Sequence, residues 1–68
     1  MREARKRVNS LERRMQTLEG KIAQAQDEQA QADPSDYIAL GEIQERIAQL
    51  QKDLGDLEEE WLEASELL

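Results

Sequence analysis

Six basic side chains within the first fourteen residues are the part of this sequence best suited to binding a charged ligand. Only two acidic residues lie among them. Clustered cations bind the phosphates of nucleic acid because each neutralised phosphate releases its counterions. We therefore predict a nucleic-acid-binding site at this basic cluster, which comprises Arg2, Arg5, Lys6, Arg7, Arg13 and Arg14.

An acidic segment offers a competing role for the same cations. Residues 53–68 carry seven acidic and no basic side chains. The net charge of −7 opposes nonspecific binding to polyanions, and no aromatic side chain is interleaved with the basic cluster for base stacking. Two roles stay open for the cluster, namely phosphate binding and neutralisation of the acidic segment.

The acidic side chains do not form a pattern that predicts a metal or catalytic site. They follow one another along an expected helix and lack the glycine-turned loop that wraps calcium. The chain has no cysteine or histidine, which excludes thiol nucleophiles, imidazole bases and the metal sites built from them. We expect no catalytic residue, metal site or cofactor in this chain. The acidic residues concerned are Asp56, Glu58, Glu59, Glu60, Glu63 and Glu66.

Apolar residues in a heptad pattern predict the elements that position these charges. With 37% charged and 3% aromatic residues, the composition is typical of long helices rather than a sheet. The apolar steps alternate between three and four residues, as in the seam of a coiled coil. The seam has two runs: Ala4, Val8, Leu11, Met15, Leu18, Ile22, Ala25, Gln29 and Ala32, then Leu40, Ile43, Ile47, Leu50, Leu54, Leu57, Trp61, Ala64 and Leu68.

A turn at residues 33–36 separates the two runs. Pro34 lacks an amide donor and clashes with the preceding turn, so the first helix should stop near residue 32. We expect Asp33 to cap the next helix, with Pro34 in its first turn and Asp36 near the positive end of its dipole.

These elements predict one all-α domain over residues 1–68. Its helices should cover about 2–32 and 37–67, folded into a two-helix antiparallel coiled-coil hairpin. Folding back about residue 36 pairs every seam layer, because facing residues such as Leu11 and Trp61 have numbers that sum to 72.

Charges beside the seam favour the same register. Folding back places the basic cluster beside the acidic segment, whereas a parallel dimer of extended chains would stack like charges. An antiparallel dimer of extended chains would satisfy the same pairing, but Pro34 argues against it. We therefore expect a monomeric hairpin. Three flanking pairs are predicted to be attractive and a fourth repulsive: Arg14 with Glu60, Lys21 with Asp53, Glu28 with Arg46, and Glu12 with Glu58.

Remaining apolar features point away from a membrane. No apolar run approaches the roughly 18 residues needed to cross a bilayer, and no signal-peptide core follows the basic start. We expect a cytoplasmic protein with no membrane partner. Leu62 and Leu67 lie off the seam near the open end of the hairpin, as a small patch suited to docking on a neighbouring domain.

Three segments at the start, turn and end of the chain are distinctive. Arg5-Lys6-Arg7 runs into Leu11-Glu12-Arg13-Arg14, the turn is Ala32-Asp33-Pro34 with Tyr37, and the ending is Leu57-Glu58-Glu59-Glu60-Trp61-Leu62-Glu63. Together they resemble the C-terminal coiled-coil domain of ABC-F ATPases of the Uup type. The resemblance covers nearly the whole chain, and the Pro turn and Trp-Leu-Glu ending are its most specific parts.

This resemblance implies that the chain is a fragment of a larger, cytoplasmic bacterial ATPase. ATP and Mg²⁺ would bind to nucleotide-binding domains elsewhere in the parent protein, which would be partners of the hairpin. The hairpin would be an accessory arm that contributes to binding of DNA, ribosomal RNA or the ribosome, through the basic cluster. The alternative is a purely structural or protein-protein coiled coil, such as a spacer or dimerisation arm.

Overall fold

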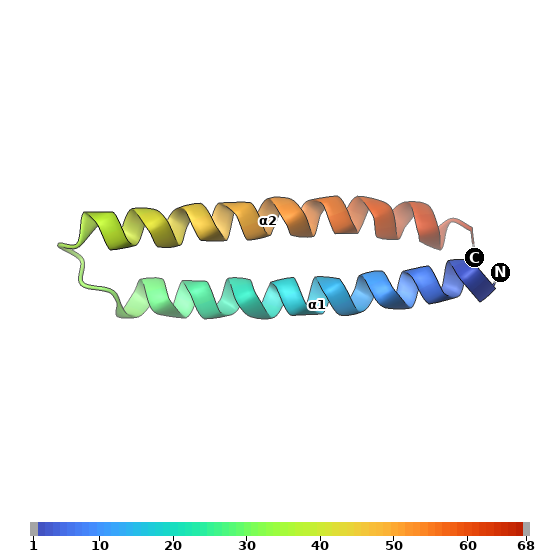
Figure 1. Cartoon of the computed structure of the whole chain (residues 1–68), viewed down its shortest axis with the longest axis horizontal. Coiled ribbons are helices and arrows are strands. Elements are labelled where there is room, and N and C mark those ends of the chain that lie inside the picture. The colour runs from blue at the N-terminus through green and yellow to red at the C-terminus, as the bar shows by residue number, and fades with distance from the viewer. Residues whose placement is uncertain (1, 68) are drawn as a thin grey trace.

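The structure is an antiparallel pair of long helices. The computed structural model describes residues 2–67, and the side chains of residues 3–67. Helices α1 (Arg2–Gln31) and α2 (Tyr37–Ser65) lie side by side, with the turn at one end, the tip, and the start of α1 beside the end of α2 at the other, the open end (Figure 1). The Cα atoms extend over 53 × 14 × 11 Å. The predicted all-α, two-helix antiparallel hairpin is confirmed.

The predicted seam is what the helices bury. Every seam residue with a described side chain is buried or partly buried, and Leu68 lies outside the described residues. Elsewhere among the described side chains, only Ala39, Asp53, Gly55 and Ser65 are covered to this extent. Apolar burial at this periodic stripe therefore holds the hairpin together. The residues that are fully buried are Val8, Leu11, Ala25, Ile43 and Ala64.

Contacts at both ends of the hairpin agree with the predicted register. Near the open end, Val8, Leu11 and Ala64 form a buried cluster, against which Leu57 and Trp61 pack. Near the tip, the Arg46 guanidinium donates to a Glu28 carboxylate oxygen at 2.8 Å. Since a slip of one heptad would move both contacts apart, the layers pair as the fold-back about residue 36 predicts.

The tip differs from the prediction in which aspartate caps α2. Asp36 is the N-cap, because its Oδ1 accepts from the Ala39 amide at 3.1 Å. Asp33 instead closes a local turn, in which its Oδ1 accepts from the Ser35 amide at 2.9 Å and the Ser35 hydroxyl at 2.8 Å. Pro34 lies in this turn, before α2. The expectation that Asp33 is the cap was wrong because a cap side chain must reach the first amides of the helix, and α2 begins only at Tyr37.

The end of α2 lies two residues before the expected residue 67. The Glu66 amide donates to the Leu62 carbonyl at 3.1 Å, and the Leu67 amide donates to the Ala64 carbonyl at 3.2 Å. The second bond spans three residues rather than four, which is the tightened geometry common in a last helical turn. The heptad pattern alone does not contain this tightening.

The contact between the Asp33 carboxyl and Ser35 is expected to depend on pH. The amide of Ser35, and to a smaller extent its hydroxyl, lower the pKa of the Asp33 carboxyl below its ordinary value of 3.8. Because the pKa is lowered in the folded state, the contact stabilises the turn above about pH 3.8 and is lost as pH falls through the lower, folded pKa.

Replacing Ser35 with alanine tests this contact. We expect Ser35→Ala to raise the pKa of Asp33 only part of the way to 3.8, because the backbone amide, the stronger contributor, is retained. An NMR titration of the Asp33 carboxyl carbon measures the change. An unchanged pKa, or a full return to the ordinary value, would contradict the arrangement described here.

Candidate nucleic-acid interface

The basic cluster occupies the first four turns of α1. Arg5, Lys6, Arg7, Arg13 and Arg14 are all exposed. Arg2 begins α1, but its side chain lies outside the described residues. The predicted cations are therefore accessible on one half of one helix, near the open end.

Helical geometry distributes these cations over three stripes rather than one patch. Each residue turns the helix by about 100°, so residues seven apart share a stripe about 10.5 Å long. Lys6 and Arg13 share the outward stripe, opposite the seam. Arg7 and Arg14 share one flank of the seam, and Arg5 lies on the other flank. The first two stripes are thus pairs of cations that can contact separate phosphates.

The five cations of the basic cluster with described side chains, Arg5, Lys6, Arg7, Arg13 and Arg14, have no anionic partner among residues 3–67. Among residues 3–67, the ion pair between Arg46 and Glu28 is the one whose charged atoms lie within 4.0 Å. Of the three attractive pairs predicted beside the seam, only this one forms. Arg14 with Glu60 and Lys21 with Asp53 do not come within 4.0 Å of each other. Exposed ion pairs gain little and must order two long side chains, so attraction beside the seam does not require direct contact.

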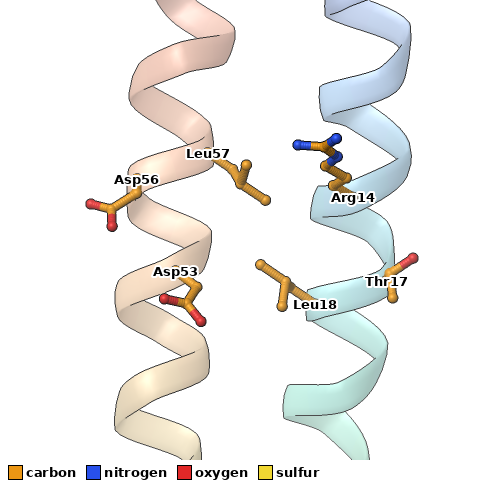
Figure 2. A pocket seen from close by; sticks show the side chains of 6 residues that line it. All are labelled: Arg14, Thr17, Leu18, Asp53, Asp56 and Leu57. Atoms are coloured by element: carbon orange, nitrogen blue, oxygen red, sulfur yellow. The ribbon is translucent and has the colours of Figure 1, made fainter.

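A shallow groove lies where the Arg14 flank meets α2. Figure 2 shows Leu18 and Leu57 pointing into the space between the helices, with the Arg14 guanidinium above them directed toward α2. Asp53 and Asp56 stand on the α2 side. The groove therefore has a basic wall, an acidic wall and an apolar floor. Its volume is about 440 Å³, and it is lined by Arg14, Thr17, Leu18, Asp53, Asp56 and Leu57.

A hydrogen bond on the opposite flank was missed in the sequence. The Trp61 indole Nε1 donates to a Glu12 carboxylate oxygen at 3.1 Å. Glu12 had been expected only to repel Glu58. The signal was present, because Trp61 faces Leu11 across the seam, Glu12 follows Leu11, and a partly buried indole N–H needs an acceptor.

Within the part of the chain that the structure describes, the other exposed features show neither a metal site nor a membrane segment. Within the described residues, no three or more acidic side chains come together in a way that could hold a metal ion. Over the same residues, neither α1 nor α2 has an apolar stretch that could span a bilayer. Large apolar side chains are exposed at both ends of the hairpin: Tyr37 and Ile38 near the tip, and Leu62 and Leu67 at the open end.

Comparison with known proteins gives one match that spans almost the whole chain. The family model described as the ABC transporter C-terminal domain matches residues 2–66. No curated protein and no solved structure matches the chain.

Proposed function

Because this chain belongs to the ABC transporter C-terminal domain family, typical of ABC-F and Uup-like proteins, we propose that it is an arm through which an ABC ATPase contacts nucleic acid or the ribosome. The family agrees with the resemblance found in the sequence, and the accessory place of this domain in an ABC protein follows from it. The contact with nucleic acid is our proposal.

Accessible cations without anionic partners carry this proposal. Direct ion pairs with the carboxylates of α2 would compete with phosphates for these side chains. The described part of the chain has no such pair for Arg5, Lys6, Arg7, Arg13 or Arg14. Both DNA and ribosomal RNA present the phosphate backbone that such cations bind.

Nucleotide hydrolysis belongs to other parts of the parent protein in this proposal. A phosphate-binding loop of an ATPase needs the pattern Gly-x-x-x-x-Gly-Lys-Ser/Thr. The glycines here are Gly20, Gly41 and Gly55, which lie inside α1 and α2 and do not form that pattern. ATP and Mg²⁺ would therefore act in nucleotide-binding domains outside this sequence, in the cytoplasm, while the hairpin positions them on their target.

Charge reversal on the outward stripe tests the proposal. We expect Lys6→Glu with Arg13→Glu to weaken binding to a short duplex DNA or an RNA hairpin about tenfold. The slope of log affinity against log salt should also fall by about 0.9 per lost phosphate contact on duplex DNA. Amide shifts of isotope-labelled chain, followed at low and physiological salt, give both the affinity and the location of the contact.

Lys52→Glu is the control for a single reversal such as Arg13→Glu, because both change the net charge by −2 and Lys52 is exposed on α2, opposite the seam. Since facing residues have numbers that sum to 72, Lys52 lies at the level of residue 20, about 9 Å along the hairpin from Arg14. This variant should bind within about twofold of the unmodified chain, since a charge beyond the Debye length of about 8 Å is screened. An equal loss in Lys52→Glu and in Arg13→Glu alone would mean that only net charge matters. The absence of salt-sensitive shifts in residues 2–14 with either ligand would favour the alternative, a spacer or protein-protein arm.

A further inference from the structure

The hairpin is a single layer of helices, so its seam is only partly covered. Full burial is confined to Val8, Leu11, Ala25, Ile43 and Ala64. Most of the larger seam residues keep part of their surface in solvent, because stable domains normally pack two layers and only one is present here. The partly covered residues include Met15, Leu18, Ile22, Leu50, Leu54 and Leu57. A second layer on either broad face would bury more of them.

Charge distinguishes the two broad faces. On the first face, which we call the Arg14 face, α1 presents Arg7, Arg14 and Lys21 at one-heptad spacing. Toward the open end, the same face of α2 carries acids, with Asp53 and Asp56 lining the Arg14 groove and Glu60 one heptad from Asp53. Near the tip the charges reverse, with Glu28 on α1 and Arg46 on α2, so the two helices still carry opposite charges at each level. On the opposite face, both helices bring acids to the seam, as Glu12 and Glu19 on α1 and Glu58 on α2.

A basic wall and an acidic wall on one face make that face complementary to itself. A two-fold axis parallel to the helices would place α1 of one copy on α2 of the other, at the same level of the hairpin. The cations of α1 would then face the carboxylates of the partner copy, and the leucines of the two floors would meet. We propose that a second copy of this chain docks on the Arg14 face, forming a four-helix bundle with both tips at the same end.

Charge also selects this orientation over its alternatives. An axis across the middle of the helices would stack α1 on α1 and α2 on α2. It would bring Arg14 close to Lys21 and Asp53 close to Asp53 of the second copy, so like charges would meet at the groove, and only the outer pairs such as Arg7 with Glu28 would attract. Pairing through the opposite face would bring Glu12 and Glu19 against Glu58. Like-charge contacts in an interface cost more free energy than exposed opposite-charge pairs at its edge gain, so repulsion disfavours these alternatives.

The size of the Arg14 face suits a modest interface. The Cα atoms of this face span 53 × 14 Å, a projected area of roughly 700 Å², so even contact over the whole face would be of about the size that each partner contributes to a standard interface, ~800 Å². Since the apolar floor is narrow and the rim is charged, the dimer should be weak and sensitive to salt. It departs from the monomer expected from the sequence because the incomplete burial of the seam appears only in the folded hairpin.

Pairing would use part of the proposed nucleic-acid surface and leave the rest free. Arg7 and Arg14 would turn into the interface, whereas Lys6 and Arg13 would stay on the outward stripe. Substitutions on the two stripes therefore separate the two properties. A failure of one proposal does not imply a failure of the other.

Charge swaps across the groove provide the test. Arg14→Glu makes both walls acidic, and Asp53→Lys with Asp56→Lys makes both walls basic. Sedimentation equilibrium from micromolar to millimolar concentration should show that the unmodified chain dimerises. For each variant alone, the dissociation constant of the dimer should rise by about tenfold or more. An equimolar mixture of the two variants should recover dimers, because each acidic groove then meets a basic one.

Two controls keep the test decisive. Circular dichroism should show equal helix content in all variants. Weaker dimerisation then cannot be explained by unfolding of the hairpin. Lys52→Glu makes the same charge change as Arg14→Glu on an exposed outward position and should dimerise like the unmodified chain. A chain that stays monomeric at millimolar concentration would overturn the proposal in favour of a helix from another protein. So would an Arg14→Glu variant that dimerises normally, or a mixture that forms no heterodimer.

Discussion

Replacing Leu11 with alanine is expected to destabilise the hairpin by about 2–5 kcal/mol, the cost of a cavity at a buried leucine. Leu11 is 3% exposed and lies in the cluster with Val8, Ala64, Leu57 and Trp61. A single layer of two helices has no second core to compensate for this loss. A loss of this size would leave much of the chain unfolded at 25 °C, visible as lower helical ellipticity and a lower midpoint in urea.

Leu62→Ala is the matched control for this prediction. It removes the same side chain from the same end of the hairpin, but Leu62 is 55% exposed. We expect its effect to stay within about 0.5 kcal/mol. If the two substitutions cost the same free energy of unfolding, the seam register described here would be wrong, because that register is what places Leu11 inside and Leu62 outside.

The second large effect is expected at Trp61. Removing its ring by Trp61→Ala should cost about 3 kcal/mol, the lower end of the range for large aromatic residues, because the ring is only partly buried. The ring covers the Leu11 cluster and its indole also donates to Glu12. Two separate terms therefore contribute, one from apolar contact and one from the hydrogen bond.

Trp61→Phe separates these two terms. Phenylalanine keeps an aromatic ring in the seam but has no N–H for Glu12, so we expect a loss of only about 0.5–1.5 kcal/mol. Glu12→Gln keeps an acceptor and should cost less than Trp61→Phe. Urea unfolding followed by circular dichroism measures all three variants. A loss for Trp61→Phe as large as that for Trp61→Ala would mean that the hydrogen bond, rather than the ring, holds Trp61 in place.

The candidate site was only partly predictable. Residue type and clustering were sufficient to select Arg5, Lys6, Arg7, Arg13 and Arg14, because a run of cations in one segment is visible in any conformation. Whether these cations form ion pairs could not be predicted, because an exposed ion pair depends on rotamers and solvent screening that heptad spacing does not specify. Spacing predicted Arg14 and Lys21 as paired as readily as Glu28, yet within the described side chains only Glu28 found its partner.

Local hydrogen bonds at the tip and the open end were less predictable than the seam. Two aspartates flank Pro34, and either could cap a following helix by type alone. Because α2 begins at Tyr37, Asp36 is the residue that caps it, and Asp33 instead accepts a hydrogen bond from the Ser35 amide. Helix starts are the least certain part of a sequence-based prediction, because neighbouring residues compete for the same amides.

The sequence by itself determined the two helices, the turn between them and the register in which they pair. Folding back about residue 36 pairs every layer of the two heptad runs, whereas a slip of one heptad would leave apolar residues at the ends without a facing partner. Tertiary structure alone decided how completely that seam is covered, which cations stay unpaired, and which broad face carries opposite charges on its two walls. These properties depend on the three-dimensional distances between side chains of two helices, which no spacing along one chain contains.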